Sequence, residues 1–174
     1  MHAELPSPEG IEESHQRPLA GWRRHANPMS ILVFGAVVLV AMTGALGHER
    51  DWHASGRGVE LRVHAPEVIR NGEFLEMRFH VTSEQRIEEL VIGIESTLWE
   101  DLTVNTMIPA ASEEASEDGE FRFTFSGLEG GTATLWKVDL QVNPDIVLGN
   151  EGSVTIYDGD EPLVSADLSI DVLP

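Results

Sequence analysis

The chain has 174 residues and carries 30 Asp and Glu against 11 Lys and Arg, which gives a net charge of −19 at pH 7. A surface this acidic repels phosphate backbones and anionic headgroups, so it excludes nucleic-acid binding and peripheral binding to anionic lipid. The sequence contains no cysteine, which excludes disulfides, thiolate catalysis, cysteine-ligated zinc and a lipid anchor attached through cysteine.

The first segment, residues 1–28, predicts a disordered cytoplasmic tail. It is polar, contains Pro6, Pro8 and Pro18, and shows no apolar periodicity.

An uncharged apolar run, MSILVFGAVVLVAMTGALG, occupies residues 29–47. At about 1.5 Å per helical residue it reaches about 28 Å, close to the thickness of a bilayer's hydrocarbon core. The run therefore predicts one transmembrane helix. A cleaved signal peptide is the alternative, with Ala45-Leu46-Gly47 as the cleavage site, although the leader before the run is long for one.

Residues on both sides of this run suit the two membrane interfaces. Trp22 and Trp52 flank it as aromatic belts do, and Arg23 and Arg24 precede it. The arginine counts on the two sides are equal, so the flanking charges leave the orientation open. The fold predicted below favours a domain outside the cytoplasm and a location in the cell (inner) membrane.

Small residues near the end of the run offer a packing face for another helix. Ala41 and Ala45 are four residues apart, with Gly44 beside them. This small-xxx-small spacing lets two helix backbones approach closely.

Residues 48–58 predict a polar juxtamembrane linker. His48 and His53 resemble a zinc-protease motif, but they are five residues apart and diverge on a helix, so no metal site is predicted there.

From residue 59 to 174 the hydrophobic period is two, which is typical of strands that bury one face. Turn signals separate the runs, among them Asn71-Gly72 and Asp158-Gly159-Asp160, whereas residues 111–119 read as an acidic loop. The alternating apolar positions include Val59, Leu61, Val63, Leu75, Met77, Phe79, Val81, Leu90, Ile92, Ile94, Phe121, Phe123, Phe125, Trp136, Val138, Leu140, Val142, Val154, Ile156, Val164, Ala166, Leu168, Ile170 and Val172.

This pattern predicts an all-β fold, an immunoglobulin-like antiparallel β-sandwich of seven to nine strands after one N-terminal transmembrane helix. Two sheets share a single core, to which Trp136 contributes bulk in place of the disulfide of antibody domains.

Several punctuation motifs support a family resemblance. They are Leu61-x-Val63-x-x-Pro66, Asn71-Gly72-Glu73, Val81-Thr82, Gly127-Leu128-Glu129-Gly130-Gly131, Asn143-Pro144-Asp145 and Val172-Leu173-Pro174. With these motifs the chain resembles a family of small bacterial single-pass membrane proteins with one extracytoplasmic Ig-like domain. The resemblance implies an outward-facing domain beside a multi-pass membrane protein, and it transfers no catalytic residue.

Oxygen ligands gather at one predicted hairpin. Asp158, Asp160 and Glu161 are weak candidates for calcium, with Asn143, Asp145 and Glu151 near in sequence. The turn itself already accounts for Asp-Gly, so no metal or cofactor is firmly predicted.

The segment 98–109 is apolar without clean alternation and has two interpretations. Trp99, Met107 and Ile108 form an exposed interaction patch, or they fill the sandwich core.

No nucleophile elbow, P-loop or dinucleotide fingerprint is present, and the strand histidines His64 and His80 have polar-face phase. The sequence therefore predicts a non-enzymatic, membrane-anchored interaction or accessory domain. The alternative is a cation- or ligand-binding envelope module that uses the acidic loops.

Overall fold

The computed structural model describes residues 23–43, 47–143 and 149–173, and from residue 28 onward it also describes the side chains. The chain divides into two compact units, Met1–Ala45 and Leu46–Pro174. The first contains helix α2 (Arg23–Met42) and the second contains the strands.

Helix α2 is 20 residues long and includes residues 29–42 of the apolar run. Its large apolar side chains are exposed, from 40% at Val38 to 78% at Met42. No helix in the described part of the chain is both long and apolar enough to cross a membrane. Residues 44–46 of the run lie outside that part. The helix begins at Arg23, so the predicted disordered tail is wrong for residues 23–28.

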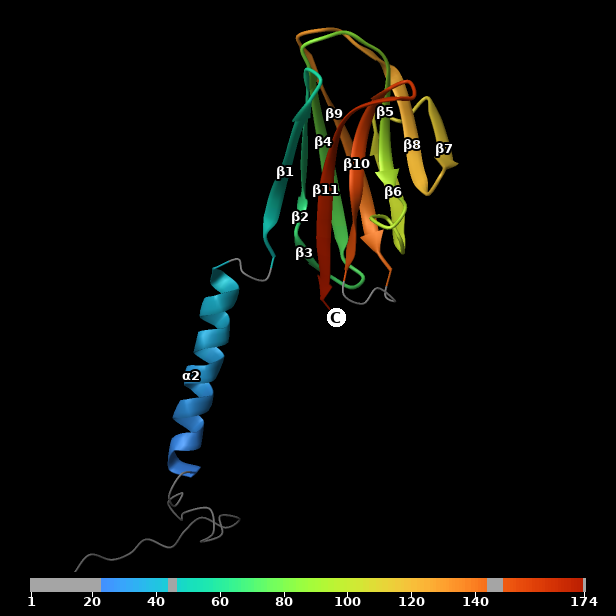
Figure 1. Ribbon diagram of the computed structural model, residues 1–174. Helices are drawn as coiled ribbons and strands as arrows, with labels where there is room; N and C mark the ends of the chain where they lie inside the picture. The colour runs from blue at the N-terminus through green and yellow to red at the C-terminus, as the bar shows by residue number, and fades with distance from the viewer. Residues whose placement is uncertain (1–22, 44–46, 144–148, 174) are drawn as a thin grey trace, which may run out of the picture. The chain divides into compact units, whose positions relative to one another are not determined.

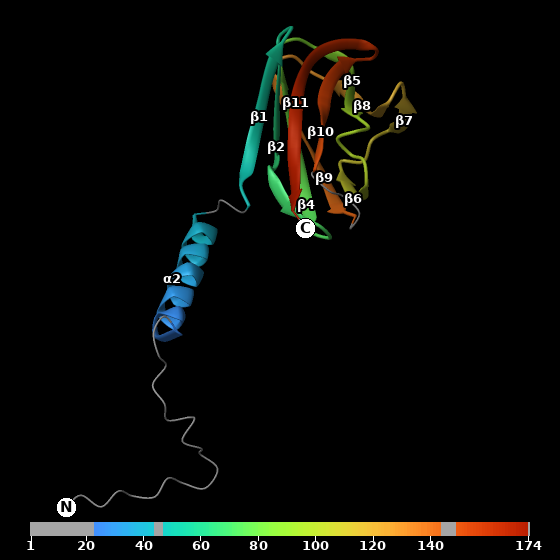
Figure 2. The same ribbon diagram turned by 60° about the horizontal axis from the view of Figure 1, so that its bottom comes forward.

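The second unit is a sandwich of two sheets (Figures 1 and 2). The all-β two-sheet prediction is confirmed, whereas the described residues form eleven strands instead of seven to nine. The strands are β1 (Glu49–Gly56), β2 (Val59–Pro66), β3 (Val68–Arg70), β4 (Phe74–Ser83), β5 (Ile87–Glu95), β6 (Leu102–Ile108), β7 (Glu113–Glu117), β8 (Glu120–Leu128), β9 (Thr132–Val142), β10 (Asn150–Asp158) and β11 (Glu161–Leu173).

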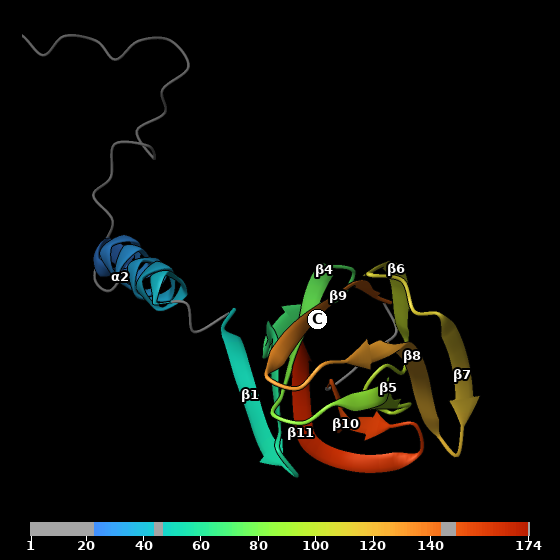
Figure 3. The ribbon, with the colours of Figure 1, turned by 90° about the horizontal axis from the view of Figure 1, so that it is seen from above.

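One sheet has five strands in the order β1-β2-β4-β9-β6, and the other has six in the order β3-β11-β10-β5-β8-β7. Among the residues that the structure describes, every strand pair is antiparallel except the short pair of β3 with β11. The strands β1 and β11 lie side by side where the two sheets meet, as the view along the strands shows (Figure 3).

The core forms because alternating apolar side chains from both sheets face each other. The predicted alternation is confirmed: β2, β4 and β11 bury alternate residues, and β9 does so from Trp136 onward. Trp136 is 1% exposed, and its ring lies 4.9 Å from those of Phe79 and Phe123. Trp136 therefore supplies the predicted central bulk.

Two predicted connections are in fact strands. The polar linker 48–58 contains β1, which pairs with β2 along its whole length. The acidic loop 111–119 contains β7, which forms a hairpin with β8 around Asp118 and Gly119. Both turn residues have positive φ, 50° and 82°, as a tight hairpin turn requires.

Candidate interaction site

The predicted patch 98–109 is divided between the core and the surface. Trp99 belongs to a tight turn after β5, in which the Trp99 N–H donates to the Ser96 carbonyl at 3.2 Å and the Trp99 carbonyl accepts from Leu102 N–H. This turn places Trp99 in the core, where it is 5% exposed and its ring lies 5.5 Å from that of Phe123. Trp99 as an exposed interaction residue is therefore wrong, and the core interpretation holds for it.

The other two patch residues lie on β6, an edge strand of the five-stranded sheet. Met107 is half-buried and packs against the core. Ile108 is 58% exposed and Val104 is 38% exposed. A strand edge with exposed apolar side chains is a place where another chain can pair. Ile108 therefore keeps its predicted place on an accessible surface.

A groove opens beside the end of β6, between the two sheets. Its volume is about 310 Å³, within the range of roughly 300–1,000 Å³ that is usual for ligand pockets. We call it the β8–β9 groove. Its lining residues are Leu90, Ile92, Pro109, Ala110, Ser112, Phe125, Ser126, Gly127, Leu128, Thr134 and Trp136.

The β8–β9 groove has an uncharged lining in a domain of strongly negative charge. Phe125 meets Trp136 edge-on with ring centroids 5.4 Å apart. The Trp136 indole N–H is buried, and no residue in the described part of the chain accepts its hydrogen bond. A buried donor without an acceptor costs about 1–3 kcal/mol, and the Trp136 nitrogen carries this cost inside the core, where it has no accessible surface.

The three hairpin carboxylates do not converge on one point. The β10–β11 hairpin itself is confirmed, with Gly159 and Asp160 as its two-residue loop. Asp158 Oδ1 accepts from the Glu89 N–H at 3.0 Å, Asp160 pairs with Arg122 at 3.2 Å, and Glu161 pairs with Arg57.

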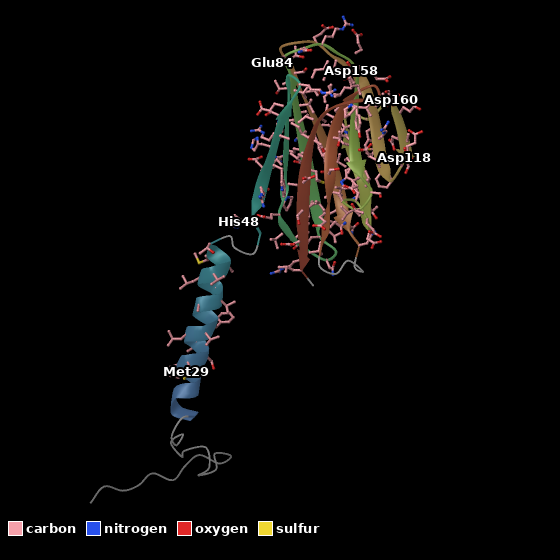
Figure 4. All side chains as sticks on the ribbon, in the orientation of Figure 1. Met29, His48, Glu84, Asp118, Asp158 and Asp160 are labelled. Carbon is pink, nitrogen blue, oxygen red and sulfur yellow. The ribbon has the colours of Figure 1, made fainter. Side chains whose placement is uncertain are left out.

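Figure 4 shows Asp158 and Asp160 at this hairpin, whereas Asp118 belongs to the β7–β8 turn. In the described ranges, no group of three or more His, Asp or Glu side chains could hold a metal ion. The calcium candidates are therefore explained as structural contacts of the turn.

Trp52 is a core residue, so the exposed position predicted for it is wrong. It lies on β1 opposite Val63 and is 8% exposed, within the hydrophobic core. The Arg50 guanidinium lies over its ring, 5.4 Å from the centroid. The pairing of β1 with β2 turns this side chain inward, and the sequence did not show that pairing.

The remaining predicted residues belong to the helical unit. Ala41 is exposed on α2, whereas Gly44 and Ala45 lie outside the described residues. Arg23 and Arg24 form the first turn of α2, with only their backbone described. Trp22 also lies outside the described residues, so the small-residue face and the interface set stay predictions.

The outer face of the five-stranded sheet carries histidines. His64 Nδ1 lies 2.9 Å from Asp51 Oδ1 and His64 Nε2 lies 3.0 Å from Glu49 Oε2. The hydrogen bond with His64 lowers the pKa of Asp51 below its usual 3.8. Desolvation and then the charge of Arg62 lower the pKa of His80. Both strand histidines have the predicted polar-face phase.

A polar network on the six-stranded sheet was not predicted. The Glu120 carboxylate accepts hydrogen bonds from Tyr157 Oη at 3.0 Å and from Arg122 Nε at 3.0 Å. The Arg122 guanidinium also lies 4.8 Å from the Tyr157 ring centroid. Desolvation and the bond to Glu120 raise the pKa of Tyr157 above 10.0. Strand register across β8, β5 and β10 creates this contact, so alternation within one strand could not reveal it.

Comparison with protein families and with curated proteins gives no match. Among solved structures, the chain is similar to the cohesin CaCohA2 from Clostridium acetobutylicum, with 13% identity, a TM-score of 0.45, and coverage of 67% of this chain and 92% of that one. A second similarity is to a non-cellulosomal cohesin from the hyperthermophilic archaeon Archaeoglobus fulgidus, with 14% identity, a TM-score of 0.39, and coverage of 63% and 88%.

Proposed function

We propose that this protein is a single-pass, non-enzymatic interaction or accessory subunit of the cell membrane. Its Ig-like sandwich lies outside the cytoplasm and docks another membrane or envelope protein at the end of β6 and the β8–β9 groove. The observation that carries this proposal is the uncharged groove beside the exposed Ile108.

The apolar run supports the anchor. Residues 29–47 carry no charge. The large apolar side chains that α2 exposes, such as Phe34 at 71% and Leu32 at 73%, are unfavourably hydrated in water. Burial of apolar surface contributes about 25 cal/mol per Å², so a bilayer or an apolar partner helix stabilises this segment strongly. Ala41 lies on the small-residue face proposed for a second helix.

The composition of the groove supports a protein partner. Interface centres are depleted of charged residues and enriched in aromatic ones. The β8–β9 groove has Phe125 and Trp136 and no charged lining residue, whereas the whole chain carries −19. A partner that fits here is therefore apolar at the contact.

Site-specific photo-crosslinking of the full chain in native membranes tests the docking site. A photoreactive residue at Ile108 is expected to give a defined adduct with one membrane or envelope protein. The matched control places it at Ser169, which is exposed on β11 of the other sheet, and is expected to give none. Equal adducts from both positions, or none from Ile108, would overturn the docking site.

A pair of charge substitutions makes the crosslinking test quantitative. Ile108→Asp is expected to lower the yield of the adduct captured from Val104 about fivefold or more, since interface truncations with an effect cost about 1 kcal/mol or more. Ser169→Asp adds the same charge elsewhere and is expected to leave the yield unchanged.

Reporter fusions test the topology separately. A reporter that is active only outside the cytoplasm is expected to be active after residue 174 and inactive before residue 1. Release of the chain from membranes by alkaline carbonate, or a reporter active only in the reverse arrangement, would contradict the proposed anchor.

A further inference from the structure

Both sheets have an uncovered strand edge at the groove. β6 pairs with β9 from Val142 to Lys137 and stops at Ile108. β7 pairs with β8 from Glu120 to Thr124. In the parts of the chain that the structure describes, no strand pairs with the same side of residues 132–136 on β9 or 125–128 on β8.

The segment that connects β6 to β7 explains why the β9 edge and the β8 edge are both unpaired next to the groove. Residues 109–112 cross from one sheet to the other, and the Ser112 N–H donates to the Thr124 carbonyl at 2.8 Å. β6 and β7 lie on the same side of the sandwich in all three views (Figures 1, 2 and 3). The β8–β9 groove begins beside this crossing, since Pro109, Ala110 and Ser112 form one of its walls.

The uncovered stretch of β9 has the size of a short strand. Five residues at about 3.3 Å each span about 16 Å. Backbone N–H and C=O groups on a free strand edge are a template for another strand. Leu135, within this stretch, is 37% exposed.

We propose that the partner supplies an extended, uncharged peptide segment that pairs with residues 132–136 of β9 and continues the line of β6. Its inward side chains are apolar and fill the β8–β9 groove against Phe125 and Trp136. This inference rests on the proposed function and names the chemistry of the partner at the same site.

The edge geometry favours a strand over a free apolar ligand. An apolar small molecule fills the groove and leaves unpaired those backbone groups of 133–136 that point away from β4. A peptide strand occupies both, because alternate side chains point inward while its backbone pairs with the edge.

A pair of synthetic peptides tests the proposal with the full chain in detergent micelles. The first is a capped heptapeptide that alternates threonine with valine and leucine. The second has the same side chains but carries N-methyl groups on the residues of one edge, which removes the backbone donors of that edge. Binding is followed by the fluorescence anisotropy of a labelled peptide, and pairing by amide hydrogen exchange of residues 132–136.

The first peptide is expected to bind and to slow exchange in residues 132–136. The N-methylated peptide is expected to bind about tenfold more weakly, which corresponds to about 1.4 kcal/mol. Ala110→Trp fills the groove from an exposed position and is expected to abolish binding. Ser169→Trp, at an exposed position on β11 of the other sheet, is the matched control and is expected to preserve binding.

Equal binding of both peptides would show that the groove takes apolar side chains without strand pairing, and would overturn the proposal. Absence of exchange protection at millimolar peptide would overturn it as well. If the Ile108 adduct still forms in membranes under either result, the proposed docking site stands and strand addition alone fails. If neither exchange protection by the peptide nor the Ile108 adduct is observed, both strand addition and the proposed docking site are overturned.

Discussion

The carboxylate of Glu120 lies directly above Gly93 of the neighbouring strand, in the space where any other residue would place its Cβ. Glu120 is held there by Tyr157 and Arg122, and its side chain is 15% exposed. Gly93 is therefore part of the polar network, since its missing side chain leaves room for the carboxylate.

Gly93→Ala is expected to destabilise the sandwich by about 1–2 kcal/mol, because the new methyl displaces a carboxylate that two donors hold in place. Urea unfolding of the full chain measures the effect. In a Glu120→Ala background the same change is expected to be neutral or stabilising, since alanine is favoured over glycine in a strand when nothing clashes. Equal costs in both backgrounds would show that Glu120 does not restrict this site.

Trp99→Ala is expected to lower the free energy of unfolding by about 3–5 kcal/mol, the usual cost of removing a buried aromatic side chain. Trp99→Phe, which keeps an aromatic ring, is expected to cost about 1–2 kcal/mol. Ile108→Ala is the exposed control and is expected to stay within about 0.5 kcal/mol. A stable Trp99→Ala variant that lost its crosslinked partner would restore the interface interpretation.

Alternation within strands predicted the sandwich because each strand buries one face, and Val59, Leu61 and Val63 reveal that face in the sequence alone. The sequence could not reveal β1, whose single large apolar residue is Trp52 and whose other inward residues include Ala54 and Gly56. Gly56 lies against the Leu163 carbonyl, so close approach to β11 demands small residues there.

The candidate site was also predicted only in part, because alternation within one strand reveals exposed residues but not where neighbouring strands stop. Ile108 could be identified as an exposed apolar residue from the broken alternation of its segment. The β8–β9 groove could not, because it depends on where β6 and β7 stop relative to β9 and β8. The sequence could not decide between surface and core for Trp99, because a turn, whose residues follow no period, carries it into the core.

Asp158→Ala is expected to cost about 1 kcal/mol, since it removes the acceptor for the Glu89 N–H. Asp158→Asn keeps an acceptor oxygen and is expected to cost less. Both variants and the natural chain are expected to show the same melting temperature with calcium and with chelator. A calcium-dependent rise in the natural chain that Asp158→Ala abolished would support the cation-binding alternative instead.

The environment of His80 predicts that the sandwich loses stability on mild acidification. Its pKa in the folded state lies below the ordinary 6.5, because burial and the nearby Arg62, His64 and Arg78 disfavour the cation more than Asp51 favours it. Below pH 6.5 the unfolded chain therefore binds more protons at this residue than the folded chain. The free energy of unfolding consequently decreases as the pH decreases.

His80→Gln is expected to reduce this fall, measured by urea unfolding on both sides of pH 6.5. Thr82→Gln, at the next outward position of β4, is the matched control that removes no titrating group, and it is expected to leave the fall unchanged. Titration of Asp51 does not affect this measurement. Its pKa is lowered, so the bond from His64 to Asp51 stabilises the fold above pH 3.8 and is lost by protonation only below that pH. An unchanged pH dependence in His80→Gln would show that His80 is not the group that titrates against folding.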